Sequence, residues 1–405
     1  MSVWRVKPVS AFEADMKKND LKRVLTRWGL TSLGIGAIIG GGIFTLTGIA
    51  AHDYAGPALA LAFVIAGIGC LFASLCYAEF ASVLPVEGSA YAYAYGTVGE
   101  LFAWFIGWNL ILEYMMGATT VAVAWSGYFV KLLHLFGIEF PIWLCNDMAT
   151  ATEKSLAANL AAPSFAFNLP AFLITWVVTA ILVKGIKEAA KTNNIIVIIK
   201  IAVVLFVIIV GAFYVKTENW VPFIPDEIPA LDELGNATGK MNFGFGGVLT
   251  AATIVFFAYI GFDAVSTQAG EAINPKKDVP FAIVASLIIC TVLYILVSLV
   301  LTGMVKYTEL DRAAPVASAF SGIGINWAVF IITIAATAGL TSVMLVMMLG
   351  QTRIFLGMAK DGLMPAFFKV LHPVFKTPYK STILVGGLIS LVAAFTPIER
   401  VSEMC

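Results

Sequence analysis

Among the ionisable side chains inside otherwise apolar stretches of the chain, four stand out: Glu79, Glu113, Lys200 and Asp263. A charge is costly to hold away from water, so each of them is a candidate for function. Lys200 stands between Ile196-Val-Ile-Ile and Ile201-Ala-Val-Val, which leaves its amine no short route to a polar surface. Loss of hydration favours the neutral amine, which would allow proton exchange at Lys200. Two other roles stay open: a fixed cation in the place of a bound sodium ion, and a permanent ion pair with a carboxylate.

The three acidic residues differ in their surroundings. Glu113 lies in the middle of an apolar run, so a proton relay, a cation site and a structural hydrogen bond are all open for it. Asp263 comes two residues after Gly261 and suits the N-cap of a restarting helix, or a contact to a substrate or ion. Glu79 lies near the end of its run, and we interpret it as part of the scaffold.

Three consecutive glycines, Gly40 to Gly42, interrupt the first apolar run. Each costs a helix about 1 kcal/mol relative to alanine, and the backbone groups that a break frees cannot face lipid. A half-helix that begins near Gly41 would point N–H groups and a positive dipole end at the break, which suits a carboxylate. Gly36 and Gly40 also fit a small-residue packing face, but that face would not explain Gly41 and Gly42. A dinucleotide fingerprint is rejected because no strand precedes these glycines.

A second interruption falls in the sixth apolar run, at Gly261 within Tyr259-Ile-Gly-Phe-Asp263. Interrupted segments at corresponding positions of two halves of a chain point to a transporter substrate site. A channel filter would not need this pairing.

The elements that carry these residues follow from the composition. Apolar residues make up 60% of the chain and charged residues 12%, and the mean hydropathy is +0.91, whereas soluble domains hold about 25% charged residues. Apolar runs of about 18 residues, enough to cross a hydrocarbon core, recur along the length. We therefore predict an all-α polytopic membrane protein with nine spans, at residues 30–50, 57–81, 99–130, 169–186, 193–215, 245–269, 281–305, 326–358 and 381–397.

The distribution of basic residues predicts the orientation. With the N-terminus in the cytoplasm, 17 of the 25 lysines and arginines flank the spans on the cytoplasmic side and seven on the other, with Lys200 inside a span. This bias favours a cytoplasmic N-terminus, although the loop at 82–98 carries no basic residue. The basic segment from Lys17 to Arg27 is interpreted as an anchor at the membrane surface, in the form of an amphipathic helix.

Several classes of protein are excluded. A net charge of zero gives no grip on nucleic acid. The five cysteines form no C-x-x-C pair and the three histidines are scattered, so we assign no disulfide framework, metal or cofactor. No P-loop, H-E-x-x-H or G-x-S-x-G is present, and an enzyme is not expected.

The chain also contains ordered motifs that resemble those of the amino acid–polyamine–organocation superfamily. They are the first-span motif Gly34–Phe44, Ala78–Pro85 with Gly88–Tyr91, and Gly107–Tyr114. A second set is similar to the cationic amino acid transporter branch, including its bacterial-type members: Phe262–Ser266, Glu271–Pro275, Gln351–Phe355 and Met358–Gly362. The similarity runs from about residue 20 to the end of the chain.

The resemblance implies a leucine-transporter-like fold with two inverted five-helix repeats and discontinuous first and sixth helices. It implies that backbone N–H groups at Gly40, Gly41 and Gly42 bind the substrate carboxylate. Carbonyls at positions that match Ile38, Phe257, Ala258 and Ile260 would hold the amino group, with Phe257 also acting as a gate. The resemblance further implies that Lys200 takes the place of a sodium ion and couples transport to protons, and that Glu113 and Asp263 match acidic positions of the branch.

Two features depart from the family pattern. Many relatives have threonine or serine at the position of Gly41, so a hydroxyl donor is missing there while the backbone donors remain. The chain also stops at Cys405, before the tenth helix that the resemblance implies. We therefore expect a C-terminally truncated chain with a cytoplasmic segment at 1–29, one transporter domain at 30–397 and a remnant at 398–405. Within that domain the first repeat would span about 30–215 and an incomplete second repeat 245–397.

The expected function is secondary active transport of a zwitterionic or cationic amino acid by alternating access, as proton symport or as amino-acid exchange. The expected partners are the amino acid, protons and the lipid bilayer, and a small accessory membrane subunit is left open. The expected location is the plasma membrane, the inner membrane of a bacterium. A membrane amino-acid sensor, a channel and a truncated fragment that does not transport are the alternatives.

Overall fold

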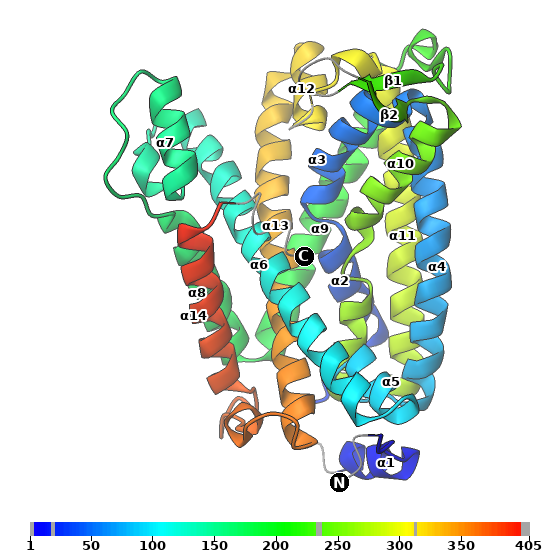
Figure 1. Cartoon of the computed structure of the whole chain (residues 1–405), viewed down its shortest axis with the longest axis vertical. Helices are drawn as coiled ribbons and strands as arrows, with labels where there is room; N and C mark the ends of the chain where they lie inside the picture. Colours follow the sequence, from blue (N-terminus) through cyan, green and yellow to red (C-terminus); the bar gives the residue numbers. More distant parts are fainter. Residues whose placement is uncertain (1–3, 18–20, 232–236, 312–313, 398–405) are drawn as a thin grey trace.

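The computed structural model describes residues 4–17, 21–231, 237–311 and 314–397. Long helices stand side by side along its longest axis, with α1 (Val9–Lys17) at one end. At the other end lie α7 (Met148–Ala157), α12 (Pro315–Gly322) and a small β-hairpin (Figure 1). We call these two ends the α1 face and the hairpin face.

Apolar helices lie within all the predicted spans, but fewer than nine stretches of the described residues are long enough to cross a membrane. Six helical stretches of the described residues are long and apolar enough to cross a membrane: Leu46–Val83, Glu100–Leu135, Ile186–Ala212, Gly244–Glu271, Pro275–Met304 and Trp327–Lys360. Two more apolar helices, α8 (Leu169–Lys184) and α14 (Tyr379–Phe395), are shorter, and the first predicted span is divided between α2 and α3. The uninterrupted long helices are α4 (Leu59–Val83), α6 (Glu100–Leu135), α9 (Ile186–Ala212), α11 (Pro275–Met304) and α13 (Asn326–Lys360).

Local sequence explains where these helices begin and end. Asn168 caps α8 through its side-chain oxygen, which accepts from the Ala171 N–H, and Pro170 occupies the first turn, where no N–H is needed. Gly185, with φ of 144°, separates α8 from α9 because this backbone conformation is strained for any residue with a side chain.

The two predicted interruptions are both present. The first span divides into α2 (Arg27–Ile38) and α3 (Gly41–Ile49). The sixth divides into α10 (Gly244–Phe256), the single turn η5 (Phe257–Tyr259) and the 3₁₀ segment η6 (Asp263–Glu271), with Gly261 at φ of 109° between them. The glycines therefore mark real breaks in helices at membrane depth.

The remaining elements are short. They comprise α5 (Ala90–Thr97), the π-helical turn η1 (Ala50–Ala55), and the 3₁₀ turns η2 (Gly56–Ala58), η3 (Ile142–Leu144), η4 (Thr217–Trp220), η7 (Tyr307–Glu309) and η8 (Ala366–Lys369). Strand β1 (Ile228–Leu231) pairs antiparallel with β2 (Ala237–Asn242), which an all-α prediction did not include. The helix predicted between Lys17 and Arg27 is also wrong, because α1 ends at Lys17 and residues 21–26 are not helical. The predicted remnant at 398–405 lies outside the described residues.

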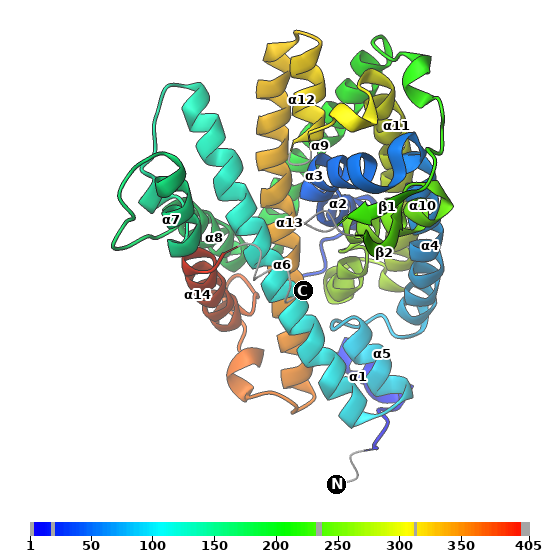
Figure 2. The same cartoon turned by 45° about the horizontal axis from the view of Figure 1, so that its top comes forward.

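Packing places the breaks at the centre of the molecule. Helix α4 lies along α11, α6 along α13, and α2 against both α9 and α11. The turned view in Figure 2 agrees with Figure 1 that α8 and α14 flank one side of this group, with α6 and α13 between. The first break therefore lies among other helices, whereas α10 of the second broken segment keeps Phe245, Leu249 and Phe256 exposed.

Candidate functional site

A cavity of about 310 Å³ lies where the two broken segments meet α6 and α13. Seven of the ten predicted site residues line it: Ile38, Gly40, Gly42, Glu113, Phe257, Ala258 and Ile260. An eighth, Gly41, is the first residue of α3, between two residues that line the cavity. Lys200 and Asp263 lie outside the cavity wall, and their positions are described below.

The first break exposes helix ends to the cavity. Gly40 is the N-cap of α3, and no side chain caps this helix, so the N–H groups of its first turn have no helical acceptor. A Cβ on Gly40 would lie 2.8 Å from a Val343 methyl, and one on Gly42 would lie 2.9 Å from the Ala258 Cα. These glycines are needed for close approach, and the free N–H groups can bind a carboxylate.

One tyrosine connects the two breaks. The hydroxyl of Tyr294, on α11, lies 2.8 Å from the Ile38 carbonyl oxygen and 3.1 Å from that of Ala258. It shares its single proton between two of the four carbonyls that we expected to hold an amino group. Each carbonyl keeps a second lone pair for a ligand. Sequence reasoning missed Tyr294, although a tyrosine in an apolar helix needs a hydrogen-bond partner and could have been noticed for that reason.

Lys200 lies behind the first break and is fully buried. Its Nζ donates to the carbonyl oxygens of Gly36, at 2.8 Å, and Ile39. These are carbonyls at the C-terminal end of α2, which lack helical partners and form the negative end of the helix dipole. Lys200 makes no ion pair with a carboxylate within the described ranges, so the ion-pair interpretation is wrong. A fixed cation next to the break agrees with this geometry.

A second donor shares the Gly36 carbonyl. The Ser342 hydroxyl lies 3.0 Å from that oxygen and 2.7 Å from Asn193 Oδ1, while Asn193 Nδ2 donates to the Ser32 carbonyl. A Cβ on Gly36 would lie 2.3 Å from the same Asn193 oxygen. The small-residue packing face predicted at Gly36 is therefore present, together with the break.

The three acidic candidates occupy different places. Glu113 lines the cavity and makes no hydrogen bond within the part of the chain that the structure describes. Asp263 is buried below the cavity, where its carboxylate accepts from the Tyr114 hydroxyl at 2.5 Å. The predicted N-cap role of Asp263 is wrong, because the cap position of η6 is Phe262 and no side chain caps it. Glu79 is exposed on α4 and does not line the cavity, in agreement with its interpretation as scaffold.

Two side walls of the cavity were not predicted. On α6, Gly117, Thr120 and Val121 continue the face of Glu113 at the spacing of one helix side. On α13, Val343 and Met347 form the opposite wall. The helical spacing from Glu113 could have identified the first wall, but no local signal identifies the second.

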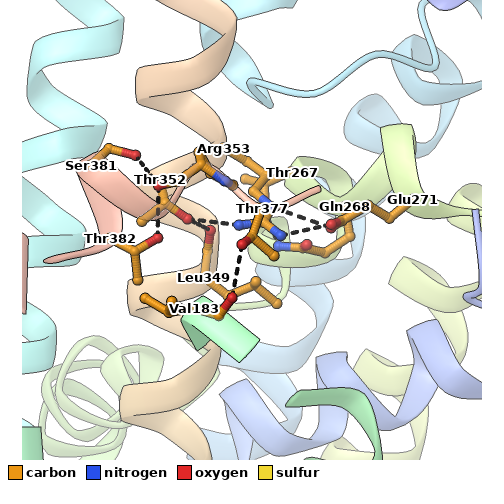
Figure 3. Close-up of polar contacts among 11 residues, drawn as sticks. Val183, Thr267, Gln268, Glu271, Leu349, Thr352, Arg353, Thr377, Ser381 and Thr382 are labelled. Atoms are coloured by element: carbon orange, nitrogen blue, oxygen red, sulfur yellow. Dashed lines mark hydrogen bonds and ion pairs between the residues drawn. The ribbon is translucent and has the colours of Figure 1, made fainter. Parts of the chain in front are cut away.

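A buried ion pair joins α13 to the last residue of η6 (Figure 3). Arg353 Nη2 donates to Glu271 Oε1 at 2.6 Å, Nε donates to Oε2 at 3.2 Å, and both side chains are about 1% exposed. The Glu271 carbonyl accepts from the N–H groups of Val24 and Leu25, just before α2. This pair therefore connects α13, the end of η6 and the residues just before α2. Its two residues belong to the motifs Glu271–Pro275 and Gln351–Phe355, for which the sequence indicated no particular role.

Two contacts join the start of the second half of the broken sixth segment to α4 and α5. Tyr77 and Phe262 stack edge to face with ring centroids 5.7 Å apart, and the Ser266 hydroxyl lies 2.7 Å from that of Ser89. Phe257, by contrast, lines the cavity but keeps 60% of its surface exposed. The role of Phe257 as a gate stays a prediction.

The class of the protein follows from comparison with known sequences. Residues 25–403 match the amino acid permease family model. The chain is 44% identical over 403 residues to the methylthioribose transporter of Bacillus subtilis, and 45% identical over 405 residues to the branched-chain amino acid permease BcaP of the same organism. Both matches cover 100% of this chain and 81% of the relative. The chain belongs to the amino acid permease family.

More distant relatives agree. Cationic amino acid transporter 4, a vacuolar protein of Arabidopsis thaliana, is 36% identical over 96% of this chain and 61% of its own length. Among solved structures, MhsT in complex with L-phenylalanine superposes with a TM-score of 0.63 at 16% identity, covering 95% of this chain and 81% of that one. The sequence matches confirm the resemblance to the superfamily and its cationic branch, and the structural match confirms the leucine-transporter-like fold.

Proposed function

We propose that this chain is a secondary amino-acid transporter that binds its substrate in the cavity between the two broken segments. The observation that carries the proposal is that the uncapped N-terminus of α3 and the two residues Ile38 and Ala258 line the same cavity. The N–H groups suit a carboxylate, and the carbonyls suit an ammonium group. A zwitterionic amino acid has both groups on one carbon.

The position of Lys200 supports two modes of transport: symport coupled to protons, or exchange of amino acids that needs no coupling cation. In our proposal its ammonium occupies the place of a coupling cation at the carbonyl end of α2, and release of its proton would loosen the first break. Glu113 lines the cavity and is a second candidate for the residue that carries the coupled proton. The hydrogen-bonded pair of Tyr114 and Asp263 is a further candidate. We further propose the α1 face as the cytoplasmic side, in the plasma membrane of a bacterium, supported by the basic residues around it.

Uptake into liposomes tests the proposal. The purified chain, reconstituted and supplied with a labelled mixture of the twenty amino acids, should accumulate at least one of them with an inward proton gradient or by exchange with preloaded amino acid. Lys200→Met should abolish gradient-driven uptake more severely than binding. Lys187→Met is the matched control, because Lys187 is exposed on the same helix. No uptake under any gradient or on exchange contradicts transport, and equal uptake by Lys200→Met and the parent contradicts the role of Lys200.

A further inference from the structure

We infer that Thr120 is a specificity-determining residue, and that the substrate side chain is neutral and carries a hydroxyl group that pairs with it. The inference rests on the proposed function, because it names the class of amino acid that the same cavity selects. It is based on one hydroxyl group that lacks a hydrogen-bond partner in the described residues, and on the apolar side chains of the cavity around it.

The Thr120 hydroxyl has no hydrogen-bond partner among the residues that the structure describes. Thr120 lines the cavity, and its Oγ1 is buried from solvent without a donor or acceptor in the described residues. A buried polar atom in this state is unfavourable, and native proteins satisfy nearly all of them. A ligand that brings a hydrogen-bonding atom would relieve the cost.

Other threonines in the apolar helices of this protein do have a hydrogen-bond partner for their hydroxyl group. The hydroxyl of Thr119 donates to the Met115 carbonyl at 2.7 Å, and those of Thr175, Thr179, Thr333 and Thr337 donate in the same way to carbonyls one turn earlier. This local bond is the common solution for threonine in a helix. Thr120 does not make it, and its χ1 angle has two accessible positions in a helix, so the hydroxyl can turn to a ligand.

The surroundings of Thr120 are apolar and uncharged. Gly117 and Val121 adjoin it on α6, and the Met347 sulfur of the opposite wall would lie 2.8 Å from a Cβ on Gly117. Glu113, which is the one ionisable side chain among the described residues of the lining, lies seven residues earlier, about 10 Å along the helix. A cationic side chain placed against Thr120 would therefore lose its hydration without gaining a counter-ion.

These features define the class of substrate. A neutral side chain fits the apolar walls, and a hydroxyl pairs with Thr120. Threonine and valine have nearly the same shape, so they separate the hydrogen bond from the fit. A site with a hydrogen-bonding group disfavours the analogue that leaves this group unpaired. We therefore expect the parent protein to bind L-threonine more tightly than L-valine.

The experiment compares two ligands, with and without a hydroxyl group, in protein variants with and without the Thr120 hydroxyl. Binding of L-threonine and L-valine to the reconstituted full chain is measured by calorimetry for the parent, Thr120→Val and Thr120→Ser. The parent should prefer threonine by about tenfold, the ratio that corresponds to one hydrogen bond. Thr120→Val should remove or invert this preference, and Thr120→Ser should keep it. Thr119→Val, which removes a hydroxyl already satisfied by the backbone, should leave the ratio unchanged.

The outcomes separate this inference from the proposed function. If Thr120→Val keeps the parental threonine-to-valine ratio while amino-acid binding persists, the inference fails and the transporter proposal stands. Preferred binding of lysine or arginine over both neutral ligands also overturns the inference alone. If the parent binds and accumulates none of the twenty amino acids, both fail together.

Discussion

At the scale of single residues, Tyr294 holds the two broken segments in register. Its hydroxyl is within hydrogen-bonding distance of the Ile38 and Ala258 carbonyls, which belong to different breaks. The orientation of both carbonyls therefore depends on a side chain that comes from neither segment. The sequence did not identify this residue, because the contact joins positions far apart in the chain.

We predict that Tyr294→Phe weakens amino-acid binding about 3- to 10-fold, the usual effect of one net hydrogen bond. The carbonyls would lose their shared donor and turn away from the ammonium site. Titration calorimetry with a transported amino acid measures the change.

Tyr259→Phe is the control, because the Tyr259 hydroxyl donates to the Phe63 carbonyl in the same aromatic cluster and not to either predicted ligand carbonyl. Equal weakening by both changes would mean that the cluster as a whole, and not the carbonyl contact, is responsible.

At the scale of elements, the breaks depend on glycine for space as well as for conformation. We predict that Gly42→Ala abolishes binding and lowers thermal stability, since the new Cβ would lie 2.9 Å from the Ala258 Cα, a backbone atom that cannot yield without moving the second break. Gly69→Ala on α4, where nothing lies within 4 Å, should leave both unchanged. Fluorescence-detected melting with and without amino acid measures both binding and thermal stability. Full binding by Gly42→Ala would show that the two breaks are less closely packed than described.

The ion pair between Arg353 and Glu271 also holds separate elements together, because it joins α13 to η6. We predict that Arg353→Met lowers the free energy of unfolding by about 3–5 kcal/mol, because it leaves the Glu271 carboxylate buried without a partner. The double change Arg353→Met with Glu271→Met should recover most of this loss, since neither charge remains. Thermal denaturation of the three variants in detergent measures the effect. A double variant no better than the single one would show that the hydrogen bonds of this cluster, not the charge, are what stability requires.

At the scale of the whole molecule, the α1 face is held closed by the N-terminal segment. Lys7 pairs with Asp361, just beyond α13, and with Asp15 at 2.6 Å, and the Tyr91 hydroxyl donates to Asp361 at 2.8 Å. We call Lys7, Asp15, Tyr91 and Asp361 the α1-face latch. A second pair, Lys360 with Glu87, lies beside it.

The pKa values of the latch determine its response to pH. Burial raises the pKa of Asp361 despite the opposing charge of Lys7, so the closed form binds a proton at Asp361 more tightly than an open form would. Burial alone would lower the pKa of Lys7, but Asp361 and Asp15 outweigh it and the pKa of Lys7 is raised. Its contribution to closure is therefore complete below its ordinary value of 10.5 and is lost as the pH rises through the raised value.

We predict that Lys7→Met opens the α1 face at neutral pH, because Asp361 is left buried without its cation, and that acidification reverses the opening as Asp361 takes up a proton. Asp361→Asn should open it less than Lys7→Met. Spin-label distances between α1 and α5 at several pH values measure the opening. Lys22→Met, at an exposed lysine of the same segment, should have no effect, and an opening of Lys7→Met that grows with acid would contradict the assigned role of Asp361.

The apolar helical segments, the two breaks and half of the residues that line the cavity could be predicted from the sequence. In a hydrocarbon core every backbone group must be satisfied internally, so length, apolarity and clustered glycines leave few other structures. The positions of Gly40, Gly42 and Gly261 could therefore be interpreted correctly without coordinates. The hairpin of β1 and β2 lies outside the core, where this constraint does not act.

Which side chains meet at the breaks depends on tertiary packing and could not be predicted from the sequence. Lys200 could equally have paired with a carboxylate, and Asp263 could have capped η6; packing placed the first against the carbonyls of α2 and the second against Tyr114. Thr120 and Met347 became walls of one cavity through the contact of α6 with α13. These pairings join residues tens to hundreds of positions apart. Local pattern does not determine them, because they depend on how whole helices cross.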